Sequence, residues 1–200
     1  MRALLLVDLQ NDFLPGGTLA VPGGDEVIPM ANALIPTFPW VVATQDWHPA
    51  GHQSFASSHP GRRVGEVIDL EGVSQILWPD HCVQRTRGAE FASQLHRDGI
   101  HAVVPKGTNP RIDSYSGFFD NGHRQPTSLE QILDARDVST VYVMGLATDY
   151  CVKFTALDAV DLGFETFLVR AGCRAVNLQP GDEEKAIAQM LAAGVQLAPP

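Results

Sequence analysis

Short apolar runs alternate with longer amphipathic segments along the chain. Most of the runs are rich in Val, Leu and Ile without polar alternation, which is typical of strands buried on both faces of a parallel sheet. Five runs have strand length, at residues 3–7, 40–43, 100–104, 138–145 and 165–169, and a short last strand is expected at residues 196–198.

Helices are expected between these strands, because the apolar residues there recur at helical spacing. The predicted helices cover residues 25–34, 88–98, 128–136, 150–162 and 182–193. This alternation of strands and helices predicts an α/β domain with a mostly parallel sheet and right-handed crossovers. A chain of 200 residues suits a single domain over residues 1–200. Two further stretches, about residues 47–86 and 107–126, are too long for ordinary connections, and such loops are usually functional.

The composition narrows the classes of partner and the cellular location. A formal net charge of -9 argues against a nucleic-acid binder, which usually carries a basic patch. The apolar runs are far shorter than the roughly 18 residues of a membrane span, and the first residues do not resemble a signal peptide. The three cysteines fit reduced thiols better than a disulfide framework. We therefore expect a cytoplasmic protein that binds a small molecule or a protein, with no nucleic acid or membrane partner.

Chemically active side chains follow the predicted strands at their carboxyl ends. The first strand leads into Asp8, the second into Asp46 and the third into Lys106, while the fourth leads into the segment GLATDYCV with Cys151. Ligands of open parallel sheets bind outside the carboxyl ends of the strands. Each residue alone has an ordinary structural explanation. However, an unpaired charge beside a buried strand would lower the stability of the fold, so we expect these groups to lie together.

Cys151 is the candidate nucleophile of this group. A lone free cysteine is more often a small core residue, so the assignment depends on its neighbours. A nucleophilic cysteine needs its thiolate form, which a helix N-terminus, a nearby cation and a nearby base all favour. Lys106 could supply the cation and Asp8 could accept the proton. The backbone N–H groups of Ala147 and Cys151 could stabilise an oxyanion.

A second group has the pattern of a metal site. Asp46 and His48 form a D-x-H pair whose side chains share one face of an extended segment. His81 is the preferred third ligand, because Pro79 stiffens its loop, and His52 and His59 compete for the position. His52 could instead bond a metal-bound water or cap a turn. Three protein ligands with open positions are typical of a catalytic or ligand-binding metal site.

Five motifs in order resemble the nicotinamidase (pyrazinamidase) branch of the isochorismatase-like cysteine hydrolase family. They are LLLVDLQNDF, TQDWHPAGHQSF, WPDHCV, KG followed by DSYSGF, and GLATDYCV, and the resemblance extends from Ala3 to about Asn177. It implies a three-layer α/β/α fold with a six-stranded parallel sheet. It also implies hydrolysis of nicotinamide to nicotinate and ammonia within NAD salvage, with pyrazinamide as a second substrate, and possible homo-oligomers.

The resemblance also implies roles for individual residues. The catalytic aspartate, lysine and cysteine fall on Asp8, Lys106 and Cys151, and a cis peptide bond is implied at Leu146–Ala147. One divalent metal, zinc, iron or manganese, falls on the set Asp46, His48 and His81 and is expected to anchor the pyridine nitrogen of the substrate.

Three aromatic residues are expected to bind the substrate ring. Phe13 and Trp78 would flank the ring and Tyr115 would close over it, although ordinary packing also explains all three. The position of Tyr150, inside or behind the pocket, stays open.

Other functions remain as alternatives. A related amidohydrolase could act on a carbamoyl or another small amide, although such enzymes usually lack the metal set. One further candidate is a metal-water hydrolase with an inert Cys151. Another is a metal or redox protein whose sensing thiols are Cys82, Cys151 and Cys173.

Overall fold

Six strands form one parallel sheet in the computed structural model, which describes residues 1–199. The strand order is β5-β2-β1-β6-β7-β8, and every neighbouring pair is parallel. This confirms the predicted sheet. The strands are β1 (Arg2–Val7), β2 (Val41–Asp46), β5 (Ala102–Lys106), β6 (Thr140–Leu146), β7 (Glu165–Arg174) and β8 (Gln196–Leu197).

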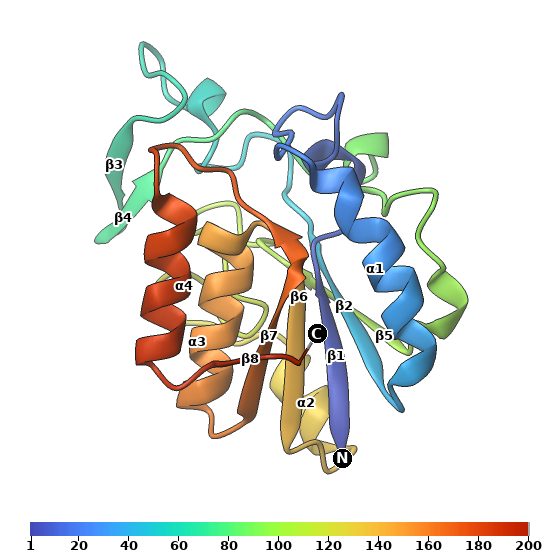
Figure 1. Ribbon diagram of the computed structural model, residues 1–200. Helices are drawn as coiled ribbons and strands as arrows, with labels where there is room; N and C mark the ends of the chain where they lie inside the picture. The colour runs from blue at the N-terminus through green and yellow to red at the C-terminus, as the bar shows by residue number, and fades with distance from the viewer. Residues whose placement is uncertain (200) are drawn as a thin grey trace.

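Helices cover both faces of the sheet and produce three layers (Figure 1). Helix α1 packs on one face, against β7 and β6, while α3 and α4 pack on the other side of the sheet. The central strand β1 is buried over five of its six residues, because both its faces are covered. The helices are α1 (Val27–Leu34), α2 (Leu129–Asp134), α3 (Lys153–Asp161) and α4 (Asp182–Ala192).

One predicted helix, at residues 88–98, is wrong. The segment contains only short 3₁₀ turns, Arg87–Ala89 and Arg97–Gly99, joined by irregular chain. Phe91 and Leu95 are buried as expected of an apolar face. However, the backbone of this segment bonds elsewhere, since Ala92 N donates to Leu9 O at 2.9 Å and Glu90 O accepts from Asn11 N at 2.9 Å. Pairing with the segment that follows β1 therefore replaces the internal bonds of a helix.

The start of the helix predicted at residues 150–162 also differs from the expectation. A single π-helical turn, Thr148–Val152, precedes α3, and Val152 N donates to Ala147 O at 3.1 Å. The peptide bond Leu146–Ala147 is cis, which confirms the feature implied by the resemblance. Just before it, Gly145 has a φ of 127° and passes so close to β1 that a Cβ atom would lie 2.1 Å from the carbonyl oxygen of Val7. Glycine is therefore required where β6 approaches the end of β1.

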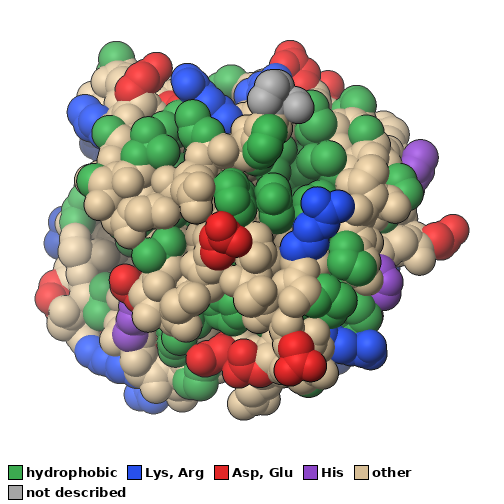
Figure 2. All heavy atoms as spheres, turned by 60° about the horizontal axis from the view of Figure 1, so that its bottom comes forward, with side chains coloured by type: hydrophobic (Ala, Val, Ile, Leu, Met, Phe, Trp, Pro, Cys, Tyr) green, Lys and Arg blue, Asp and Glu red, His purple; other side chains and the backbone are tan. Residues whose placement is uncertain are grey.

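A small antiparallel hairpin lies in the first long irregular stretch and was not predicted. It consists of β3 (Val67–Leu70) and β4 (Val73–Ile76), and it stands beyond the carboxyl ends of the main strands (Figure 1). On the opposite side of the molecule, acidic, basic and apolar side chains are interspersed (Figure 2). Within residues 1–199, no helix has the length and apolar content needed to cross a membrane.

Candidate active site

The carboxyl edge of the sheet brings the predicted residues together. Asp46 and Lys106 are the last residues of β2 and β5 and pair directly in the sheet register. Asp8 follows β1, and Cys151 lies in the π-helical turn that follows β6. Because neighbouring parallel strands end at one level, four side chains distant in sequence meet at this edge.

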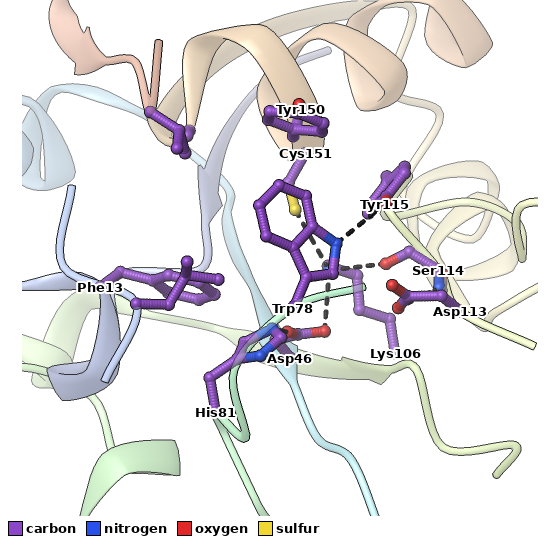
Figure 3. Close-up of a pocket in the computed structure, with 13 residues that line it drawn as sticks. Phe13, Asp46, Trp78, His81, Lys106, Asp113, Ser114, Tyr115, Tyr150 and Cys151 are labelled. Carbon is purple, nitrogen blue, oxygen red and sulfur yellow. Dashed lines mark hydrogen bonds and ion pairs between the residues drawn. The ribbon is translucent and has the colours of Figure 1, made fainter. Parts of the chain in front are cut away.

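Lys106 lies at the centre of this group and is almost completely buried, at 2% exposure. Its Nζ atom lies 2.9 Å from Asp8 Oδ2 and 3.0 Å from Asp46 Oδ1, donates to Ser114 O at 2.8 Å, and lies 3.5 Å from Cys151 Sγ (Figure 3). Burial by itself lowers the pKa of an ammonium group, but the charges of Asp46 and Asp8 outweigh it and raise the pKa of Lys106 well above its ordinary value. Lys106 is therefore a permanent cation between two carboxylates.

Asp8 is a fully buried carboxylate whose two oxygens have different neighbours. Its Oδ1 accepts a hydrogen bond from Thr44 Oγ1 at 2.6 Å, which leaves Oδ2 facing Lys106. Burial is the largest effect on Asp8 and raises its pKa, and the charge of Lys106 offsets this only in part. A raised pKa makes Asp8 a better proton acceptor than an ordinary carboxylate.

Cys151 does not have the lowered pKa that its position near a helix start predicts. Burial is the dominant cause and raises the pKa of the thiol well above its ordinary value; Lys106 lowers it, while Asp8 raises it further. The expectation neglected desolvation, which disfavours the charged form of any buried group. Burial therefore favours the neutral form of the thiol, whose proton has to leave when the sulfur reacts.

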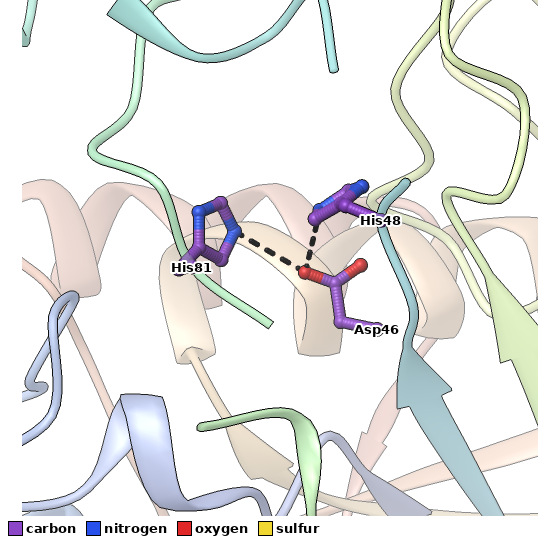
Figure 4. Close-up of side chains that lie close together, drawn as sticks. All are labelled: Asp46, His48 and His81. Carbon is purple, nitrogen blue, oxygen red and sulfur yellow. Dashed lines mark ion pairs between the residues drawn. The ribbon is translucent and has the colours of Figure 1, made fainter. Parts of the chain in front are cut away.

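Asp46, His48 and His81 form a second, adjacent cluster (Figure 4). Within residues 1–199 it is the one group of this kind, with one ligand atom per residue and all of these atoms within 4.8 Å of one another. Asp46 Oδ2 lies 2.8 Å from His48 Nε2 and 3.2 Å from His81 Nε2. Although burial alone raises the pKa of Asp46, the charges of His48 and Lys106 hold it well below its ordinary value.

The hydrogen bonds of the two histidines suit a bound divalent metal. His48 Nδ1 lies 3.0 Å from Gly107 O, and His81 Nδ1 lies 2.8 Å from Pro79 O. These carbonyls accept the Nδ1 protons and leave both Nε2 atoms free to act as ligands, as is common for histidines bound to metals. His48 Nε2 is buried without a well-oriented hydrogen bond despite its approach to Asp46. A divalent cation held between Asp46 and the two Nε2 atoms would give each of these nitrogens a partner.

The competing histidines do not join this cluster. His52 uses both ring nitrogens elsewhere, because Nδ1 lies 2.8 Å from Ser54 Oγ and Nε2 lies 2.8 Å from Asn109 O. Its ring packs on that of His48, with the ring centroids 4.4 Å apart. His59 Nε2 lies 2.7 Å from Gln53 O. The structure thus places His52 behind a metal ligand, where it supports the ring of His48.

A mainly apolar pocket joins the two clusters. It holds about 380 Å³ of empty space, part of it open to solvent. Lys106, Cys151 and two residues of the metal cluster, Asp46 and His81, line it together with aromatic residues (Figure 3). Its lining residues include Phe13, Asp46, Trp78, His81, Lys106, Asp113, Ser114, Tyr115, Ala147, Tyr150 and Cys151. All three aromatic residues expected around the substrate ring are among them.

The structure places Tyr150 and adds two pocket residues that the sequence analysis did not single out. Tyr150 lines the pocket, with its ring centroid 4.9 Å from that of Trp78, which answers the question of its position. Asp113 Oδ1 lies 3.9 Å from His48 Nε2, beside the metal cluster. Asp113 and Ser114 belong to the DSYSGF motif, so this motif was the available signal, but only the fold shows which of its side chains turn inward.

Comparison with known proteins agrees with this arrangement. The model of the isochorismatase domain matches residues 2–198. The chain belongs to the isochorismatase family. Within this family it is 52% identical over 200 residues to the nicotinamidase of Escherichia coli (strain K12), an alignment that covers 98% of this chain and 93% of the relative.

Solved structures of the isochorismatase family share the fold. An Acinetobacter baumanii nicotinamidase and pyrazinamidase superposes with a TM-score of 0.95 at 46% identity, over 98% of this chain and 94% of the other. A pyrazinamidase of Pyrococcus horikoshii, solved in complex with zinc, has a TM-score of 0.80 at 40% identity, with 98% of each chain covered. The buried Asp-His-His cluster of this chain has the donor set that could hold a divalent metal.

The metal cluster predicts opposite results for two neighbouring histidines. His48→Ala removes a ligand, so the purified, dialysed protein should lose its metal, whereas His52→Ala should retain it with an affinity reduced by less than about 100-fold, the range for supporting residues. Elemental analysis and chelator competition measure both quantities. If His52→Ala lost metal as completely as His48→Ala, His52 would belong to the ligand set.

Proposed function

We propose that this chain is a nicotinamidase, an amide hydrolase that converts nicotinamide to nicotinate and ammonia and also accepts pyrazinamide. The observation that carries the proposal is that one mainly apolar pocket is lined both by Cys151 and Lys106 of the Cys-Asp-Lys group and by Asp46 and His81 of the Asp-His-His group. The first group suits covalent attack on an amide, and the second suits a metal that anchors a ring nitrogen. The named activity of the Escherichia coli relative supports the same conclusion.

The pocket would hold the pyridine ring between its aromatic walls. Phe13 and Trp78 offer flat apolar surfaces, and Tyr115 and Tyr150 extend the wall next to Trp78. Asp46, His48 and His81 would hold a divalent ion, which would accept the lone pair of the ring nitrogen and fix the orientation of the ring. The carboxamide then faces the other end of the pocket, where Cys151 lies.

Cys151 and Asp8 carry out the first half of the reaction. The thiol proton passes to Asp8 as the sulfur attacks the amide carbon, and the carbonyl oxygen takes up negative charge. Asp8 then returns the proton to the amide nitrogen, the C–N bond breaks, and ammonia leaves. The product is a thioester between Cys151 and the pyridine carbonyl.

The second half of the reaction uses the same groups. Asp8 accepts a proton from water, which attacks the thioester carbon. Asp8 then returns this proton to the sulfur as the C–S bond breaks, which restores the thiol, and the released acid loses its own proton to solvent as nicotinate. The backbone N–H groups of Ala147 and Cys151 are our candidates for the oxyanion site. Lys106 keeps Asp8 charged in the resting state and places it against the sulfur.

We further propose zinc as a suitable ion, for which the zinc complex of the Pyrococcus horikoshii relative is the support. Iron or manganese would fit the same donor set of one carboxylate and two imidazoles. We also propose a cytoplasmic location, since Cys82, Cys151 and Cys173 are all free thiols.

A small panel of substrates tests the proposed function. Ammonia release should be fast with nicotinamide and pyrazinamide, and absent with N-carbamoylsarcosine and isochorismate. The reason is that only the first two present an amide on a ring that carries a nitrogen for the metal. Preference for N-carbamoylsarcosine would identify the chain as a carbamoyl amidohydrolase and refute the proposal.

The covalent mechanism predicts that Cys151→Ala is inactive. Turnover of nicotinamide should fall by at least about 10³-fold, since the nucleophile is lost, while the metal content stays at the wild-type level. Cys173→Ala is the matched control, because Cys173 is buried outside the pocket. Mass spectrometry should detect a trapped acyl adduct on Cys151 in the wild type. Near-normal activity of Cys151→Ala would instead favour a metal-water hydrolase.

The raised pKa of Asp8 predicts the acidic limb of the pH profile. Asp8 must be ionised to accept the thiol proton, so kcat/KM should fall as the pH decreases through its pKa, which lies above the ordinary carboxyl value of 3.8. Because the pKa of Cys151 is also raised, the neutral thiol persists and kcat/KM should not fall between neutral pH and about pH 9. Metal content measured at each pH excludes loss of the ion as the cause. An acidic limb at or below 3.8 would contradict the role of Asp8.

A further inference from the structure

Gln75 is the one strand residue of the β3–β4 hairpin whose side chain is buried. Its exposure is 1%, whereas the residues before and after it on β4 are exposed or half-buried, and Val67 on β3 is 58% exposed. A buried amide on an otherwise exposed hairpin has to satisfy its polar atoms. The partners of this amide show what the hairpin does.

The carboxamide of Gln75 reaches across to the loop that carries Asp113 and Tyr115. Its Nε2 atom lies 3.1 Å from Asp113 Oδ2 and 3.1 Å from the phenol oxygen of Tyr115, and 2.7 Å from Ile76 O. Its Oε1 atom accepts from Asn121 Nδ2 at 3.3 Å, and Asn121 Oδ1 in turn accepts from Tyr115 N at 2.8 Å. One neutral side chain therefore binds both a carboxylate and a phenol of this loop.

The two residues that Gln75 holds are walls of the pocket. Tyr115 also accepts a hydrogen bond from Trp78 Nε1 at 3.0 Å, so its phenol oxygen is fixed from two sides (Figure 3). Asp113 and Tyr115 flank Ser114, whose carbonyl accepts from Lys106 at 2.8 Å. Gln75 itself is not a lining residue of the pocket. It acts on the pocket through residues that do line it.

We propose that Gln75 is a positioning residue for the substrate ring: through its bonds to Asp113 and Tyr115 it holds the Tyr115–Trp78 wall at the distance the ring needs. The inference rests on the proposed function. An amide suits this task because its two N–H groups serve the carboxylate, the phenol and Ile76 O, one of them shared, while its oxygen accepts from Asn121. Within residues 1–199, the Gln75 amide is the hydrogen-bond donor to Asp113 Oδ2.

Two variants separate this hydrogen-bonding role from simple packing. Gln75→Met has a similar length but no donor, and Gln75→Glu has almost the same shape but places a second carboxylate beside Asp113. If packing alone mattered, Gln75→Glu would be the milder change. If donation to Asp113 and Tyr115 matters, Gln75→Glu is the more severe, because like charges at this distance repel and the donor is lost. Ser74→Ala is the matched control, since Ser74 is an exposed neighbour on the same strand.

The experiment compares steady-state kinetics with nicotinamide for the metal-loaded full-length variants. The KM of Gln75→Met should rise about tenfold with kcat within about twofold, the pattern of lost ground-state binding. The KM of Gln75→Glu should rise further, and that of Ser74→Ala should match the wild type. The rate of Cys151 alkylation by iodoacetamide and the metal content should be unchanged, because neither depends on the ring wall.

Each other outcome overturns the inference. A wild-type KM in Gln75→Met, or a milder defect in Gln75→Glu than in Gln75→Met, would exclude positioning by hydrogen bonds. A parallel loss of kcat, metal and melting temperature in both variants would mean that Gln75 only stabilises the fold. A wild-type enzyme that releases no ammonia from nicotinamide would instead overturn the proposed function. An active wild type therefore shows that any such result in the variants concerns the role of Gln75 and not the proposed function.

Discussion

The site depends on one buried ion cluster, in which the ammonium of Lys106 lies between the carboxylates of Asp8 and Asp46. All three groups are 3% exposed or less. Removing charges from water costs several kcal/mol per ion unless pairing and hydrogen bonds offset it. Here Lys106 contacts both carboxylates and the carbonyl of Ser114, and Thr44 binds the second oxygen of Asp8. Loss of Lys106 would leave two carboxylates without their cation in the interior, whereas loss of either carboxylate would leave Lys106 paired with the other.

This ion cluster also connects the metal site to the group that contains Cys151. Asp46 gives one oxygen to Lys106 and the other to the two histidines, so one carboxylate belongs to the ion cluster and to the metal site. Asp8 and Cys151 stand on the other side of Lys106. The distance between the metal cluster and the ammonium of Lys106 is thus set by two adjacent parallel strands, β2 and β5, whose register pairs Asp46 with Lys106. Rigid elements hold such distances better than loops do.

The sequence was informative where chemistry follows a buried strand. Asp8, Asp46 and Lys106 were predictable because each comes directly after or at the end of an apolar run, and strand ends meet at one edge. His48 follows from the alternation of side chains in D-x-H. The prediction of a helix at residues 88–98 was wrong because the spacing of Phe91 and Leu95 indicates only that these side chains are buried. It carries no information on the backbone partners, which lie some eighty residues earlier in the chain.

Gln75, Asp113 and Tyr150 could not be placed from sequence for a related reason. Gln75 and Asp113 lie on an isolated hairpin and on a loop, and Tyr150 lies in the π-helical turn before α3, so tertiary contacts decide the direction of all three side chains.

The pKa of the thiol was misjudged because the argument from sequence counted favourable charges and left out desolvation. The correction changes how the nucleophile works. A buried thiol with a raised pKa beside a carboxylate with a raised pKa stays neutral at rest. Thiolates are the form that oxidants attack, so a neutral thiol is protected between turnovers. In the mechanism that we propose, proton transfer to Asp8 becomes favourable only when the charge moves on from the sulfur to the carbonyl oxygen of a bound amide. The same desolvation that seems to disable the nucleophile therefore restricts its reactivity to the moment when substrate fills the pocket.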